Sequence, residues 1–95
     1  MKMPFKFAVN RIEDKYLVVS ADEESPARLV ISCDEISAFL FSQLTADLTE
    51  AQMLEIAKTQ FPDTEESVLT EKVLAVREYV RNIDPHNTEL EVIKL

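Results

Sequence analysis

The sequence predicts one α+β domain in which a three-stranded antiparallel sheet is followed by three helices. Apolar residues alternate with a period of two in the first third of the chain, and they recur at helical spacing after residue 33. Ninety-five residues suit a single domain. We therefore expect one domain over residues 1–95, with a core of about residues 5–84 and a C-terminal extension over residues 85–95.

The three strands are expected early and in sequence order. Phe5, Phe7 and Val9 alternate with polar or small residues, as in a strand with one buried face. A second apolar run over residues 16–19 follows a short polar turn, and a third covers about residues 27–31. Sequential strands with short polar connections pair as hairpins, so an antiparallel sheet is predicted.

The first helix is expected over about residues 33–45. Ser32 and Glu35 fit the Ser-x-x-Glu capping box, in which two side chains satisfy free backbone N–H groups at the helix start. Apolar residues from Ile36 to Leu44 then fall on one helical face. The third strand therefore leads directly into a helix, and this segment is predicted to be core.

Two further helices follow, and a fourth strand is suggested after them. Thr49 and Gln52 form a second capping box, whose helix is expected to end at Pro62. Asp63 or Thr64 could cap the third helix, which carries the longest apolar stripe. This stripe consists of Leu69, Val73, Val76, Val80 and Ile83. Residues 89–95 are strand-like, and could join an edge of their own sheet or pair with a second copy in a homodimer.

Charge and composition exclude several classes of function. The formal charge of −8 lies in residues 32–95, which carry five basic and thirteen acidic side chains. Phosphate binding needs clustered Lys and Arg, so nucleic acid is not expected as a partner. No apolar run is long enough to span a membrane and no signal-peptide pattern follows Met1. A cytoplasmic protein without a membrane partner is expected.

Residues that carry catalytic or metal chemistry are scarce. Cys33 is the only cysteine, His86 is the only histidine, and glycine is absent. This excludes an internal disulfide, a Cys/His metal cluster and a glycine-rich phosphate loop. No base and nucleophile can be assembled around His86, and Cys33 is predicted to be a buried structural thiol. We expect neither an enzyme nor a bound metal or cofactor.

Residues 29–41, LVISCDEISAFLF, resemble the PqqD family. An apolar strand, a Ser-x-Asp-Glu junction and a helix that begins small-small-Phe-aliphatic-aromatic follow one another as they do in that family. A weaker match continues through residues 48–49 to residues 74–80, so the resemblance covers about residues 5–84. Three strands followed by three helices, the last two as a helix-turn-helix-like pair, also make a winged-helix-type arrangement.

The resemblance implies a non-catalytic chaperone or adaptor. PqqD-like domains are recognition elements for ribosomally made precursor peptides. They bind the leader of the precursor and present it to a modifying enzyme, which is a radical SAM protein in PQQ biosynthesis. In the family the leader adds as a strand beside the third strand and lies against the third helix, which is β-augmentation. The family often ends its third helix with a glycine-containing stop, whereas Pro85 and ten further residues follow here.

The candidate peptide-binding residues lie on the third strand and the third helix. They are Arg28, Leu29, Val30, Ile31, Leu74, Arg77 and Arg81. Three consecutive apolar residues cannot all face the helices, so at least one points away and needs cover. A leader peptide, the tail or a dimer partner could provide that cover, and simple exposure is also ordinary. If the tail occupies this edge, it would compete with the leader.

The arginines have two interpretations, and the whole chain has two rival functions. Arg77 and Arg81 could pair with acidic leader side chains, or could complement the helix dipole and pair locally, as Arg81 could with Glu78. A winged-helix DNA-binding regulator shares the layout, but the third helix is not basic. A structural subunit that only stabilises a partner enzyme is the other alternative.

Overall fold

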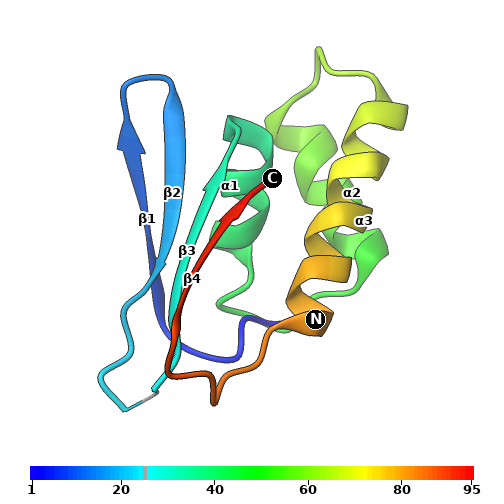
Figure 1. Cartoon of the computed structure of the whole chain (residues 1–95). Helices are drawn as coiled ribbons and strands as arrows, with labels where there is room; N and C mark the ends of the chain where they lie inside the picture. The colour runs from blue at the N-terminus through cyan, green and yellow to red at the C-terminus, as the bar shows by residue number, and fades with distance from the viewer. Residues whose placement is uncertain (25) are drawn as a thin grey trace.

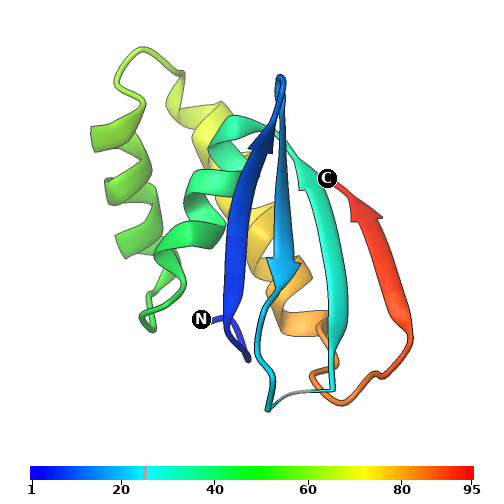
Figure 2. The same cartoon turned by 90° about the vertical axis from the view of Figure 1, so that its left-hand side faces the viewer.

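A computed structural model, which describes residues 1–24 and 26–95, shows a four-stranded sheet packed on three helices (Figure 1). The strands are β1 (Phe7–Ile12), β2 (Lys15–Ser20), β3 (Arg28–Cys33) and β4 (Leu90–Lys94). The helices are α1 (Glu35–Gln43), α2 (Glu50–Gln60) and α3 (Glu66–Asn82). Figure 2 shows that these helices lie behind one face of the sheet and leave its opposite face open. The predicted α+β class is confirmed.

The sheet is mixed, which corrects the expectation of a purely antiparallel sheet of three strands. β1, β2 and β3 pair antiparallel in sequence order, whereas β4 pairs parallel with β3. The chain passes through all three helices between β3 and β4, and a crossover of this kind returns to the sheet in the same direction. The fourth strand predicted at residues 89–95 is present over Leu90–Lys94.

The turn between β1 and β2 uses a strained residue in place of glycine. Glu13 has a φ of 58°, in the left-handed region that glycine adopts most easily. For a residue with a Cβ this conformation costs roughly 1–2 kcal/mol. The tight turn fixes the register, with Ile12 paired to Lys15 and Phe7 to Ser20. The hairpin predicted for the first two strands is therefore present.

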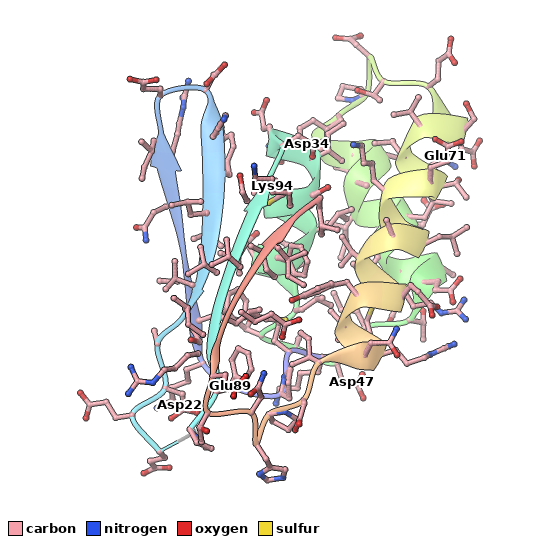
Figure 3. The ribbon with its side chains drawn as sticks, viewed as in Figure 1. Asp22, Asp34, Asp47, Glu71, Glu89 and Lys94 are labelled. Atoms are coloured by element: carbon pink, nitrogen blue, oxygen red, sulfur yellow. The ribbon has the colours of Figure 1, made fainter. Side chains whose placement is uncertain are left out.

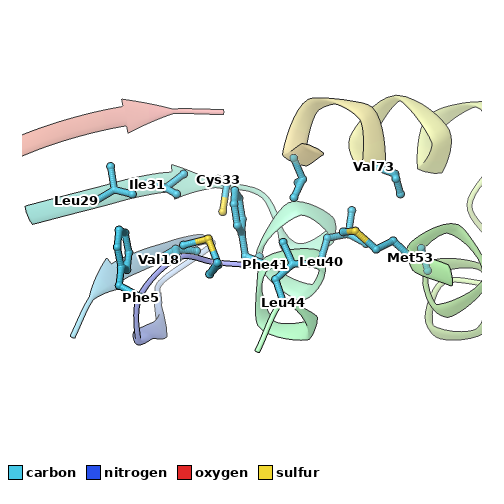
Figure 4. Close-up of a cluster of buried hydrophobic side chains, with 14 of the residues drawn as sticks. Phe5, Val18, Leu29, Ile31, Cys33, Leu40, Phe41, Leu44, Met53 and Val73 are labelled. Atoms are coloured by element: carbon cyan, nitrogen blue, oxygen red, sulfur yellow. The ribbon is translucent and has the colours of Figure 1, made fainter. Parts of the chain in front are cut away.

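One apolar core connects the sheet to all three helices. Ile31 of β3, Phe41 of α1 and Met53 of α2 have no exposed surface. Figure 4 shows these side chains in a continuous cluster that reaches Val73 on α3. The predicted stripe of α3 faces this cluster, because Leu69, Val73 and Val76 are buried and Val80 and Ile83 are partly buried.

The helix starts differ in part from their predicted caps. α1 is capped by Asp34, whose Oδ1 accepts from the Ser37 N–H at 2.8 Å. Ser32 does not cap α1, because it still belongs to β3 and pairs with Leu17. The capping box of Thr49 and Gln52 is confirmed at the start of α2.

The start of α3 has no side-chain cap. Its N-cap residue is Glu65, so neither Asp63 nor Thr64 caps it. The helix begins one residue later than a Thr64 cap implies and two later than an Asp63 cap implies, and Glu66 supplies the negative charge that favours a helix N-terminus. In the described parts of the chain, no helix is long and apolar enough to cross a membrane.

Candidate functional site

The candidate site is the edge of β3 that pairs with β4. Arg28–Ser32 pair along this edge with Leu90–Lys94, so the edge expected to bind a peptide is occupied by the chain's own tail. Leu29 and Ile31 point into the core and are buried. Val30 is the apolar residue that points away from the helices, and it is half-buried beside Val92. β4 therefore occupies the edge of this strand, but it does not cover the outward face that carries Val30 (Figure 2).

β4 is attached mainly through its backbone. Beyond the strand ladder, the Leu95 N–H donates to the Ser32 carbonyl at 2.8 Å. Ile93 is partly buried against the core, whereas the other four residues of β4 are exposed. Among the described residues, no side chain of β4 takes part in a hydrogen bond or an ion pair. β4 thus fills the position of an added strand while burying little apolar surface.

Tyr79 lies on the side of α3 that faces β4. Its ring packs edge-on against Phe41, with the ring centroids 6.1 Å apart. Burial, with a smaller contribution from the nearby Glu91 carboxylate, raises the pKa of Tyr79 to about 12. The phenol therefore stays neutral at physiological pH, and it can donate or accept a hydrogen bond beside the strand position.

An ion pair lies at the end of the site where β3 is followed by α1. The Lys72 ammonium of α3 pairs with Oδ2 of Asp34, the residue that caps α1. Burial alone would raise the pKa of Asp34, but hydrogen bonds from Lys72 and Ser37 outweigh it and hold that pKa below its usual value. Asp34 and Lys94 lie at this end of the sheet, and Glu89 lies at the other (Figure 3). The pair ties α3 to the end of β3.

The structure does not bring the predicted residues of α3 to the β3 edge. Leu74 lines a small cleft between α2 and α3 with Ala51 and Leu54. Arg77 pairs with the Glu50 carboxylate of α2, and the guanidinium of Arg81 lies 3.8 Å from Oε2 of Glu78. These side chains lie on the α2 side of the helix, while Lys72 and Tyr79 lie on the opposite flank, where they contact Asp34 and Phe41.

Sequence reasoning missed Lys72 and Tyr79 because both flank the buried stripe on the side opposite to Leu74 and Arg77. The stripe identifies which face of α3 is buried, but either flank could border the third strand. The spacing of seven residues between Lys72 and Tyr79 shows that they share one flank. Choosing between the flanks requires the handedness of the packing, which is a property of the tertiary structure.

Cys33 is buried at the end of β3, as predicted for a structural thiol. Burial, followed by the charge of Asp34, raises the pKa of Cys33 to about 11 despite the opposing effect of Lys72. A thiol in this state is a poor nucleophile. Among the described residues, no group of three His, Cys, Asp or Glu side chains is arranged to hold a metal ion.

Comparisons with protein-family models, curated proteins and solved structures give no match to this chain. The resemblance to the PqqD family therefore depends on residues 29–41 and the weaker pattern around them. The geometry contributes separately, because it shows an extended segment paired with the β3 edge, with Glu91 near enough to Tyr79 of α3 to affect its pKa.

Proposed function

We propose that the chain is a non-catalytic, winged-helix-like domain that binds an extended peptide by strand addition at the β3 edge. By resemblance to the PqqD family, the peptide is the leader of a ribosomally made precursor, and the domain presents it to a modifying enzyme such as a radical SAM protein. The packing of α2 against α3 after a short turn supports the winged-helix-like description. The bound peptide would take the place that β4 holds.

The observation that carries this proposal is the pairing of β4 with the edge of β3. Five consecutive residues of β3 pair with β4 in a regular parallel register. Strand addition derives its affinity from such main-chain hydrogen bonds and its specificity from alternate side chains. The edge of β3 is thus shaped to hold an extended segment, and a segment from another chain needs the same backbone geometry.

A ligand at this edge must first displace β4, and the structure favours such an exchange. β4 buries only part of one side chain in the core and follows a polar segment over residues 84–89. A tethered strand competes at a high effective concentration, of the millimolar order for a short flexible connection. A leader peptide would therefore need contacts that β4 lacks, such as a larger inward side chain or a hydrogen bond to Tyr79.

The experiment uses two lysine substitutions in the full-length chain that differ only in the direction of the side chain. Ile93→Lys places a charge on the inward face and is expected to release β4, because a charged side chain is disfavoured where Ile93 packs against the apolar core. Val92→Lys places the same charge on the outward face and is expected to leave β4 in position. The probe is a synthetic peptide with the sequence of residues 87–95, titrated into each protein and followed by amide NMR.

We expect the peptide to shift amide signals of β3 and of the Lys72–Tyr79 side of α3 in the Ile93→Lys protein. Val92→Lys and the unsubstituted protein should bind the peptide about threefold to fivefold more weakly, because their own β4 occupies the edge. Shifts confined to other surfaces would contradict the proposed site. The absence of binding to an Ile93→Lys protein whose β4 is demonstrably released would contradict strand addition itself.

A further inference from the structure

The face of the sheet opposite the helices carries a continuous apolar row. The registers place Ala8 beside Val19, Val19 beside Val30, and Val30 beside Val92. One row therefore crosses all four strands on the face that Figure 2 shows uncovered. We call this surface the outer face, and define it by the outward positions of β1, β2, β3 and β4.

The outer face is more apolar than an exposed sheet face usually is. A sheet with one solvated face normally alternates apolar and polar residues, with the polar residues outward. Here Leu17 adds to the row, and Leu90 and Val92 of β4 are mostly exposed. The half-buried Leu17, Val19 and Val30 do not belong to the side chains packed on the core. The row is thus a second apolar surface, separate from the core.

The charges on the outer face are of one sign. Its charged residues are Lys15, Arg28 and Lys94, and no Asp or Glu stands at an outward position of any of the four strands. The chain as a whole has 18 acidic and 10 basic residues. In a parallel or antiparallel ladder, paired residues point to the same side, so Glu91 points inward with Leu29. The strands of the outer face therefore carry only cations, whereas Asp22, Glu23 and Glu24 of the loop before β3 line a hollow with Val19, Arg28 and Val30.

The size of this surface limits what can cover it. Four strands about 4.8 Å apart and five residues at about 3.3 Å each give an area of roughly 300 Å². A stable dimer needs roughly 800 Å² from each partner. A second copy would also bring its own lysines and arginine against these, which is unfavourable. The outer face alone is therefore unsuited to pairing with itself.

The arrangement of charge around the row matches an acidic amphipathic helix. Arg28 lies two residues before Val30, and Lys94 lies two residues after Val92, so the cations flank the row by about 6.6 Å on opposite sides. A helix is about 10 Å wide with its side chains. A helix laid along the row would bury an aliphatic stripe on Val19 and Val30, and would place its flanking carboxylates near both cations.

We propose that the outer face docks an amphipathic helix of a partner protein, with an aliphatic stripe flanked by Asp and Glu. An anionic lipid surface shares part of this chemistry. It is the less suitable occupant, because the net charge of −8 repels an anionic bilayer and the outer face has no aromatic side chain for the membrane interface. The proposal does not depend on peptide binding at the β3 edge, since it uses the sheet with β4 in place.

The test uses two synthetic 18-residue helical peptides and the full-length protein. One peptide has a leucine stripe flanked by glutamates, and the other has lysine at every glutamate position. Amide NMR would follow both titrations. The acidic peptide is expected to shift signals of the outward residues of β2, β3 and β4, and the basic peptide is expected to bind at least tenfold more weakly.

Matched variants separate binding by charge complementarity from non-specific hydrophobic binding. Arg28→Glu combined with Lys94→Glu should weaken binding of the acidic peptide at least tenfold and improve binding of the basic one. Lys2→Glu combined with Lys58→Glu makes the same change in net charge away from the outer face and should leave both affinities unchanged. Val19→Thr with Val30→Thr keeps β-branched side chains but makes the row less apolar, and should weaken the binding of both peptides.

Four results from titrations with the two peptides and with anionic lipid vesicles would overturn the proposal. These are no outer-face shifts with millimolar acidic peptide, equal binding of the two peptides, shifts centred on the helices, and binding to anionic vesicles without binding to the acidic peptide. The solution mass is measured over the same concentration range. A concentration-dependent dimer abolished by Val30→Lys would also contradict the proposal, since it would assign the outer face to a second copy.

Discussion

β3 and β4 are adjacent strands joined by a regular ladder, yet only β3 belongs to the core. The inward residues Leu29 and Ile31 of β3 are 5% and 0% exposed, whereas of the inward residues of β4 Glu91 is exposed and Ile93 is only partly buried. The two strands share backbone pairing but differ in buried apolar area, which dominates stability. We therefore expect β3 to open only when the domain unfolds and β4 to detach by itself.

The largest expected effect tests whether β3 belongs to the core. Ile31→Ala should lower the free energy of unfolding by about 2–5 kcal/mol, because it leaves a cavity at a fully buried position. Val30→Ala, one residue earlier and outward, should cost no more than about 1 kcal/mol. Denaturant unfolding monitored by circular dichroism gives both values. Equal losses for the two variants would contradict the inward and outward assignment.

A smaller effect is expected where β3 meets α1. Asp34→Ala removes the N-cap of α1 and the partner of Lys72, and should cost about 1–2 kcal/mol near neutral pH. Asp34→Asn retains a good capping side chain but loses the ion pair, so it should cost less. Urea unfolding of both variants separates the contribution of the N-cap to the free energy of unfolding from that of the ion pair. An Asp34→Ala variant as stable as the unsubstituted protein would exclude both contributions.

The same carboxylate gives a pH dependence of known sign. The folded-state pKa of Asp34 is below its usual value, so its contribution is fully present above about pH 4, the usual range of an unfolded Asp. The contribution is lost as the pH falls through the lowered folded-state pKa. The stability difference between the unsubstituted protein and Asp34→Asn should therefore be constant from pH 5 to 7 and shrink below pH 4. A difference that grows on acidification would contradict this.

Release of β4 should change global stability still less. Ile93→Lys is expected to lower the free energy of unfolding by less than about 1 kcal/mol, because Ile93 is only partly buried. It should nevertheless remove the hydrogen-exchange protection of β4 and of the β3 amides that face it. Val92→Lys is the control and should keep that protection. Cooperative unfolding of the whole domain on Ile93→Lys would show that β4 is part of the core after all.

The smallest expected effect concerns Cys33. With a pKa of about 11, only about one thiol in a thousand is ionised at pH 8, so alkylation by iodoacetamide should be slow in the folded protein. In Ile93→Lys the rate should change by no more than a few-fold, because β3 stays packed. A rate close to that of the unfolded chain would mean that detaching β4 also opens β3.

The sequence predicted those elements whose pattern is local. The alternation in β1 and β2, the capping box at Thr49 and the stripe of α3 each depend on neighbouring residues, and the structure confirms them. The start of α1 was misplaced because Ser32 and Asp34 both suit a cap. Pairing with β2 and β4 extends β3 past Ser32 and leaves Asp34 to cap the helix.

The long-range features of the site could not be predicted from the sequence. A strand-like tail over residues 89–95 was evident, but not its parallel pairing with β3, which depends on where three helices return the chain. The inward direction of Leu29 and Ile31 follows from parity only once the outward residue is known to be Val30. The flank of α3 that borders β4 depends on how that helix packs, so Lys72 and Tyr79 could not be distinguished from Arg77 and Arg81.

The parallel pairing of β4 with β3 has a consequence for the newly synthesised protein. β3 and β4 are separated by roughly 60 residues of chain, which a ribosome adds in about 3–12 s at 5–20 residues per second. During that interval the first three strands can form a hairpin sheet whose β3 edge has no neighbour. An unpaired edge strand is a template for association with other chains. The last strand to be translated is therefore the one that closes this edge, and a peptide present during synthesis would meet it before β4 does.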